Sequence, residues 1–284
     1  MLKRWIKAFR LEEVFLMSGF FIIGGIFAIE SFDKENIVKL LLISIMSFFI
    51  VISVYAFNSA AGKEQDKNNI RLKNLWDFKK CTFLIFAIVS FTISMVISIY
   101  LKPVSATISL IIIIIWILYS HPRFGLKQKA IWGTIIHFIG QILHFNLAYI
   151  IFCNISIESV FVSMYFAFAF SSGHLLHEII DYDADKQAGL KTSAIMFGHK
   201  KTLIAIISLL IINFLLLIFL GFFGYIDKTA FFCFLPASFF HLIYMVRFYY
   251  SKNINPIVIR NTYRILYFIS GFTFFVFLIF DYLK

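Results

Sequence analysis

The chain contains the run Ile108-Ser109-Leu110-Ile111-Ile112-Ile113-Ile114-Ile115-Trp116-Ile117-Leu118. A segment of this kind is typical of a helix in the hydrocarbon core of a membrane, which is about 30 Å thick. The rest of the chain agrees, because its 284 residues are 61% hydrophobic and only 14% charged. This composition excludes a soluble domain and indicates a polytopic membrane protein.

Nine segments are apolar over the roughly 17–25 residues that a transmembrane helix needs. They are 14–31, 36–58, 81–101, 103–120, 131–152, 156–175, 202–223, 229–247 and 263–282. No Pro/Gly/Ser-rich linker divides them. We therefore expect an all-α membrane bundle of about nine transmembrane helices, forming a single domain over 1–284. Its basic and aromatic start, 1–13, is predicted to be an interfacial segment.

The basic residues gather on one predicted side of the membrane. If the N-terminus is cytoplasmic, the inner segments hold 21 of the 26 Lys and Arg residues. This is the positive-inside pattern, so we expect an integral membrane protein with a cytoplasmic N-terminus, and a prokaryotic cell membrane as its location. Because topology accounts for the net charge of +11, no nucleic-acid partner is expected.

The main cluster of acids follows the sixth predicted span, in His177-Glu178-Ile179-Ile180-Asp181-Tyr182-Asp183-Ala184-Asp185. On a continuous helix, Glu178, Asp181 and Asp185 would share one face, and Asp183 would point away. Three carboxylates on one face repel unless a cation joins them, and hard oxygen ligands favour Mg²⁺. The alternative is a solvated run of charges.

A second helix end has the same spacing. Asn58, Gly62 and Asp66 follow the second span at an offset of 119 residues (185 − 66) from the acidic cluster, which is four spans later. An even number of spans brings both ends to the same membrane side, so we predict two pseudo-repeated four-helix halves plus one helix. Two such ends can hold a pyrophosphate through Mg²⁺, and nearby basic residues can bind its oxygens. The candidates for that role are Lys63, Arg123, Lys127 and Lys186.

A polar stripe on the fifth span is the candidate substrate pocket. His137, Gln141 and His144 lie within a narrow arc, and polar side chains within a membrane usually face the bundle interior. Tyr119 and His177, near the cytoplasmic ends of their spans, complete the predicted pocket. The alternative for this stripe is hydrogen bonding between helices that glycines allow to approach closely.

Taken together, the motifs resemble the UbiA-type intramembrane prenyltransferases, over most of the chain. The acidic cluster is similar to the family's second aspartate motif, and the segment from Tyr119 to Lys127 looks like its Tyr-Ser-x-Pro signature. The first motif is degenerate, because Ser59 and Gly62 stand where the family has acids. Gly125 likewise stands where the signature has Arg.

The resemblance implies an enzyme that transfers a prenyl group from an isoprenyl diphosphate to an aromatic or lipid acceptor, with Mg²⁺ as cofactor. It implies that Asp66, Lys127, Asp181 and Asp185 are catalytic. The implied metal ligands are Asn58, Asp66, Glu178, Asp181 and Asp185. The alternatives are a membrane terpene cyclase of the same family, a diverged member without prenyl transfer, and a transporter or structural membrane protein.

Overall fold

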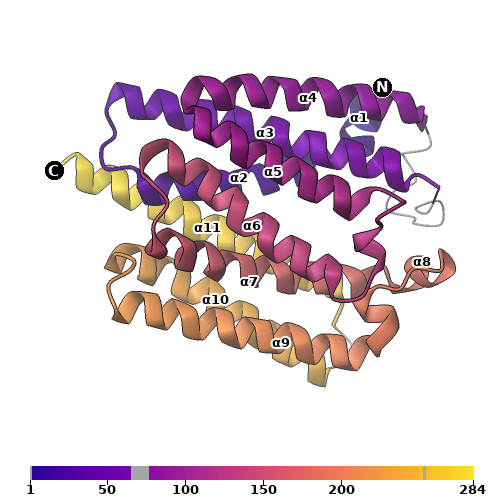
Figure 1. Cartoon of the computed structure of the whole chain (residues 1–284). Helices are drawn as coiled ribbons and strands as arrows, with labels where there is room; N and C mark the ends of the chain where they lie inside the picture. The colour runs from indigo at the N-terminus through magenta and orange to yellow at the C-terminus, as the bar shows by residue number, and fades with distance from the viewer. Residues whose placement is uncertain (1, 65–76, 252–253) are drawn as a thin grey trace.

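The computed structural model of the chain describes residues 2–64, 77–251 and 254–284. This part is helical, and it contains nine helices that are long and apolar enough to cross a membrane, as predicted. The helices are α1 (Leu2–Ala8), α2 (Leu11–Ala28), α3 (Lys34–Gly62), α4 (Lys80–Leu101), α5 (Pro103–Ser120), the 3-10 helix η3 (Leu126–Gln128), α6 (Trp132–Phe152), α7 (Ile157–Ile180), α8 (Tyr182–Gln187), α9 (Ser193–Phe222), α10 (Lys228–Tyr250) and α11 (Pro256–Tyr282). Of these, α1, η3 and α8 are too short to cross a membrane, and α1 and α8 are labelled in Figure 1.

Neighbouring helices pack in the same order in each half of the bundle. In the first half α2 packs on α3, α3 on α4 and α4 on α5; in the second α6 packs on α7, α7 on α9 and α9 on α10. The halves meet where α6 contacts α2 and α5, and the additional helix α11 packs on α10 and α7. This order agrees with the predicted two four-helix halves and one additional helix. In Figure 1 the two chain termini lie at opposite ends of the bundle, as an odd number of spans requires.

A close contact joins the first helices of the two halves. A Cβ atom at Gly24 on α2 would overlap the carbonyl oxygen of Phe145 on α6. Only glycine therefore allows these two backbones to approach so closely, which is a common device between membrane helices.

Polar side chains link helices inside the bundle. Asn146 Nδ2 on α6 donates to Ser163 Oγ on α7 at 3.0 Å, and Ser159 Oγ donates to Asn146 Oδ1 at 2.9 Å. Asn213 Nδ2 on α9 donates to the Tyr165 carbonyl oxygen on α7 at 2.6 Å. These bonds satisfy polar groups that lipid cannot, and they hold α7 between α6 and α9.

The predicted interfacial segment 1–13 divides into two parts. Helix α1 ends at Ala8, and residues 11–13 already belong to α2. Trp5 and Phe9 pack against aromatic rings at the start of α4, with ring centroids 4.6 Å apart for both Trp5–Phe78 and Phe9–Phe86. At the turn, Arg10 has a left-handed backbone (φ 53°) and stacks its guanidinium over the Tyr55 ring of α3.

Candidate active site

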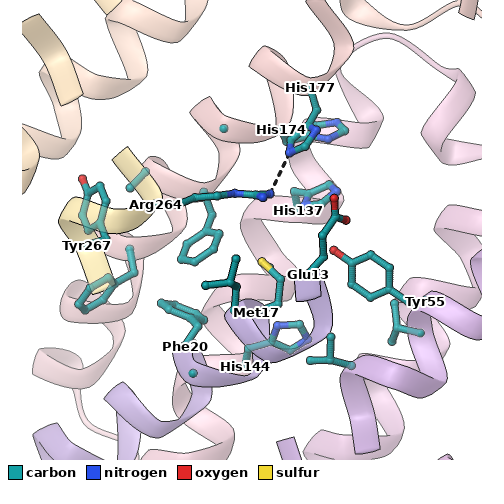
Figure 2. Close-up of a pocket in the computed structure, with 18 of the residues that line it drawn as sticks. Glu13, Met17, Phe20, Tyr55, His137, His144, His174, His177, Arg264 and Tyr267 are labelled. Carbon is teal, nitrogen blue, oxygen red and sulfur yellow. Dashed lines mark hydrogen bonds between the residues drawn. The ribbon is translucent and has the colours of Figure 1, made fainter. Parts of the chain in front are cut away.

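A cavity of about 480 Å³ lies between α2, α3, α6, α7 and α11. Its two ends differ in chemistry. The end near the acidic cluster is lined by polar and charged side chains, and the rest is lined by apolar residues of α2, α7 and α11, such as Ile22, Phe166 and Phe275. Figure 2 shows rings and charged groups of these helices turned toward this space, among them His137 of α6 and Arg264 of α11.

The acids at the end of α7 line this cavity as the sequence predicts, although the helix is not continuous. The helix breaks at Asp181 (φ −92°, ψ 6°), and the short α8 follows. The Asp185 N–H still donates to the Asp181 carbonyl oxygen at 2.9 Å, so one helical turn bridges the break. Glu178, Asp181 and Asp185 all line the cavity, whereas Asp183 is exposed outside it.

Glu178 has a structural contact that the spacing did not reveal. Its side chain is buried, and its Oε2 accepts a hydrogen bond from the Ala194 N–H at 3.1 Å. Ala194 is in the first turn of α9, where a carboxylate is stabilised by the helix dipole and by unsatisfied N–H groups. The other oxygen lies 3.2 Å from His174 Nε2. Glu178 therefore joins α7 to α9 as well as facing the cavity.

The end of α3 supplies a polar group to the same cavity. Asn58 lines it, and its Oδ1 is buried with no hydrogen-bond partner among the residues that the structure describes. Ser120 Oγ and Thr192 Oγ1 are buried in the cavity wall and also have no hydrogen-bond partner among the described residues. Gly62 is not part of the wall, and Asp66 lies outside the described residues.

These oxygen donors fit Mg²⁺. Asn58 comes from one motif and Asp181 and Asp185 from the other, and all three face one space. In the described part of the chain no three His, Cys, Asp or Glu side chains form a ready-made cation site. Mg²⁺ does not need one, because it usually binds one or two carboxylates and completes its shell with water and substrate phosphate.

One of the four basic candidates lines the cavity. Lys127 does so from η3, whose preceding residue Gly125 has a positive φ of 53°. This left-handed backbone favours glycine. The Lys191 N–H donates to the Gln128 carbonyl oxygen at 3.1 Å and ties this loop to the one after α8.

The other three basic candidates lie outside the cavity wall. Lys63 Nζ donates to the carbonyl oxygen of Phe78, while Arg123 and Lys186 are exposed to solvent. Their role in binding a diphosphate therefore remains a prediction.

The predicted pocket residues form most of one aromatic wall. His137 and His174 stack with centroids 4.0 Å apart, and the Tyr119 ring stands edge-on to His137 at 5.2 Å. Trp116 Nε1 donates to His144 Nε2 at 3.1 Å, which makes that nitrogen an acceptor. His177 also lines the cavity.

Gln141 is the exception in the predicted pocket. It is fully buried, and it is not among the side chains that line the cavity. The structure thus corrects the assignment of Gln141 to the pocket.

Gly133 makes room for the acidic face. A Cβ atom at this position of α6 would lie 3.0 Å from His174 Nε2 and 3.7 Å from Glu178 Oε1. We expect Gly133→Ala to displace the His174 ring and to lower the turnover of isoprenyl diphosphate about tenfold, since small misplacements near a reacting group are costly. Turnover and thermal stability measured on the same sample will show whether the effect is local. A Gly133→Ala protein with wild-type turnover would contradict this role.

The sequence alone did not identify the part of the wall formed by α2 and α11. Arg10, Glu13, Tyr263, Arg264 and Tyr267 line the cavity. Arg10 forms an ion pair with Glu13, and Arg264 Nη2 donates to His177 Nε2 at 3.0 Å (Figure 2). The only sequence signal was a basic residue near a helix end, which the positive-inside rule explains equally well.

The apolar end of the cavity reaches the lipid-facing surface of the bundle. Leu16 of α2 and Phe268 and Phe272 of α11 line the cavity and are also 45%, 60% and 59% exposed. The apolar end of the cavity therefore faces the lipid side of the bundle between α2 and α11.

Residues 18–280 match the UbiA prenyltransferase family. The chain belongs to this family. A search of curated protein sequences returns no match. Members of the family are intramembrane prenyltransferases, and the nine apolar helices agree with an integral membrane protein of this kind.

Solved UbiA structures have the same fold as this family member. A UbiA homologue from Archaeoglobus fulgidus bound to DMAPP and Mg²⁺ has a TM-score of 0.74 and 16% identity, covering 96% of this chain and 98% of that one; the same homologue is also known with GPP and Mg²⁺. A digeranylgeranylglyceryl phosphate synthase has a TM-score of 0.72 and 18% identity, covering 97% of each chain. An apo UbiA homologue from Aeropyrum pernix K1 has a TM-score of 0.70 and 15% identity, covering 95% and 98%.

Proposed function

We propose that this UbiA-family member is an Mg²⁺-dependent prenyltransferase that moves an isoprenyl group from an isoprenyl diphosphate to an aromatic or lipid acceptor. One observation carries the proposal: oxygen donors from two separate helix ends, Asn58 and the pair Asp181 and Asp185, face the polar end of a cavity whose other end is apolar and open to lipid. This division matches a substrate with a charged head and a hydrocarbon tail. Binding of DMAPP or GPP with Mg²⁺ by the Archaeoglobus fulgidus homologue supports the same assignment.

In this proposal the diphosphate binds at the polar end and the prenyl chain lies along α2 and α11. Bound Mg²⁺ would supply positive charge that stabilises the departing pyrophosphate. Asn58, Asp181 and Asp185 would hold it, and Lys127 would donate to a phosphate oxygen. The C–O bond then breaks, the pyrophosphate leaves with the electron pair, and an allylic cation remains.

The aromatic wall keeps water from this cation and attracts it. Tyr119 and Trp116 present ring faces or edges to the cavity, and a ring face attracts a cation by about 0.5–2 kcal/mol. When the acceptor forms its bond to the cation, it loses a proton. His137 is better placed than His144 to take this proton, because His144 Nε2 already accepts a hydrogen bond from Trp116.

The proposal is tested with the purified full-length chain, Mg²⁺, a series of C5 to C20 isoprenyl diphosphates and a membrane extract as the source of acceptor. We expect Mg²⁺-dependent release of pyrophosphate and a new lipid whose mass is that of an acceptor plus a prenyl group. A product without acceptor mass, either the hydrocarbon left when the prenyl cation loses a proton or the alcohol formed when it captures water, would indicate a terpene cyclase. Failure to release pyrophosphate with every donor would contradict the proposal and favour a non-catalytic member.

A further inference from the structure

A half-buried cation of α11 has no place in the two-motif site described above. Arg264 lies eight residues into α11 from Pro256, which is about 12 Å along the helix at 1.5 Å per residue. Helix α11 is the one helix of the bundle without a counterpart in the repeat, so the motif spacing does not point to it. Arg264 faces the cavity inside the bundle, and for a charged side chain in that position a functional role is the first hypothesis.

The hydrogen bonds of Arg264 go to uncharged rings. Its Nη2 donates to His177 Nε2 at 3.0 Å. Because a guanidinium can only donate, His177 accepts with a neutral nitrogen, and a neutral ring does not balance the positive charge. Within the described residues no carboxylate forms an ion pair with Arg264. Glu13, the acid of the adjacent wall, pairs with Arg10 instead.

The position of the guanidinium suits a ligand. Figure 2 shows Arg264 extending from α11 across the cavity toward His177, while Tyr267 stays beside α11. The side chain lines the cavity, and the apolar residues Phe20 and Met17 line it as well. A guanidinium has five N–H donors, and the hydrogen bonds to His177 and to the Tyr263 hydroxyl use two of them. The remaining donors can form the paired hydrogen bonds that guanidinium makes with carboxylates and phosphates.

We propose that Arg264 binds an oxyanion of a substrate where the polar and apolar parts of the cavity meet, with His177 holding the guanidinium in place. The oxyanion is a phosphate group of the donor or an acidic group of the acceptor. The inference rests on the proposed function, and it adds a binding residue from outside both metal motifs.

The test compares Arg264→Gln with the matched variant Arg247→Gln, in the full-length chain in lipid nanodiscs. Arg247 is exposed at the end of α10 and does not line the cavity, so its substitution removes the same charge from the same predicted membrane side. Binding is measured calorimetrically for two probes: geranyl S-thiolodiphosphate with Mg²⁺, an unreactive donor analogue, and benzoate, an aromatic monoanion.

We expect Arg264→Gln to weaken one probe about tenfold to a hundredfold, as for loss of a hydrogen bond to a charged group, and Arg247→Gln to weaken neither. Weaker binding of the analogue assigns Arg264 to the donor, and weaker binding of benzoate assigns it to the acceptor. Equal binding of both probes by Arg264→Gln and the wild type overturns the inference, including the case in which neither protein binds benzoate.

A second variant keeps the test decisive if Arg264→Gln does not fold. Arg264→Lys keeps the charge but cannot form two parallel N–H bonds, so we expect several-fold weaker binding of the same probe. If Arg264→Gln does not fold, wild-type affinity of Arg264→Lys for both probes overturns the inference. The binding data also distinguish this inference from the proposed function. If the wild type binds the analogue through Arg264 but does not turn over a donor, only the proposed prenyl transfer is contradicted. If the wild type turns over a donor and the Arg264 variants bind both probes as the wild type does, only the role of Arg264 is contradicted.

Discussion

Asp181→Ala and Asp185→Ala are each expected to reduce Mg²⁺-dependent release of pyrophosphate on the order of a thousandfold. Both carboxylates line the polar end of the cavity, Asp181 at the break between α7 and α8 and Asp185 within α8. Their removal takes away the hard oxygen ligands that Mg²⁺ requires and leaves the departing pyrophosphate without its main source of positive charge. Release is measured with a coupled phosphate assay over a range of Mg²⁺ concentrations.

Asp183→Ala is the matched control for these two variants. It removes the same charge from the same segment, but Asp183 is exposed and does not line the cavity. We expect its rate to stay near that of the wild type. Equal thermal stability of the three variants shows that α8 is intact. Retained release in both Asp181→Ala and Asp185→Ala would show that this motif does not bind the metal.

Gly24→Ala is expected to give the largest loss of stability among the glycine positions of the bundle. The added Cβ would overlap the Phe145 carbonyl oxygen, and a backbone atom inside a helix cannot move aside as a flexible side chain can. The helices α2 and α6 must then separate, so we expect a loss of about 1–3 kcal/mol or more in the free energy of unfolding. Thermal unfolding in detergent or nanodiscs measures the change.

Gly19→Ala separates this effect from the general replacement of glycine in a membrane helix. Gly19 is on the same helix, and a Cβ there meets nothing within 4 Å. Since alanine favours a helix over glycine by about 1 kcal/mol, Gly19→Ala is expected to be neutral or stabilising. If both variants unfold at the wild-type temperature, the close contact between α2 and α6 does not hold the halves together.

Much of the fold follows from local sequence properties. Each of the nine spans is an apolar run, and an apolar run in lipid must form a helix because its backbone groups have no other partners. The ends of the helices were harder to predict from the sequence. The sixth span continues to Ile180, five residues beyond the expected 175, because His174 and Glu178 face a protein cavity and do not need bulk water.

The candidate site was predictable where a residue type and a spacing act together. Asn58 and the acids Asp181 and Asp185 share a cavity because the repeat brings two helix ends to one side of the membrane. Spacing did not separate Lys127, which lines the cavity, from Lys63 and Lys186, which do not. All three are basic residues near the same surface. The direction of their side chains depends on the backbone conformation of the loops, which the periodicity of a helix does not predict.

The sequence by itself determined the nine-helix membrane bundle and the acidic motif of the UbiA family, and the sidedness expected from its charges stays a prediction. These features depend on composition and on spacing within one helix. Only the tertiary structure decided that Glu178 also anchors α9, that Gln141 is buried away from the cavity, and that Arg264 reaches His177 across it. Each of these depends on which helices are neighbours and how they are rotated, and that is set by the packing of side chains and glycines between segments far apart in the chain.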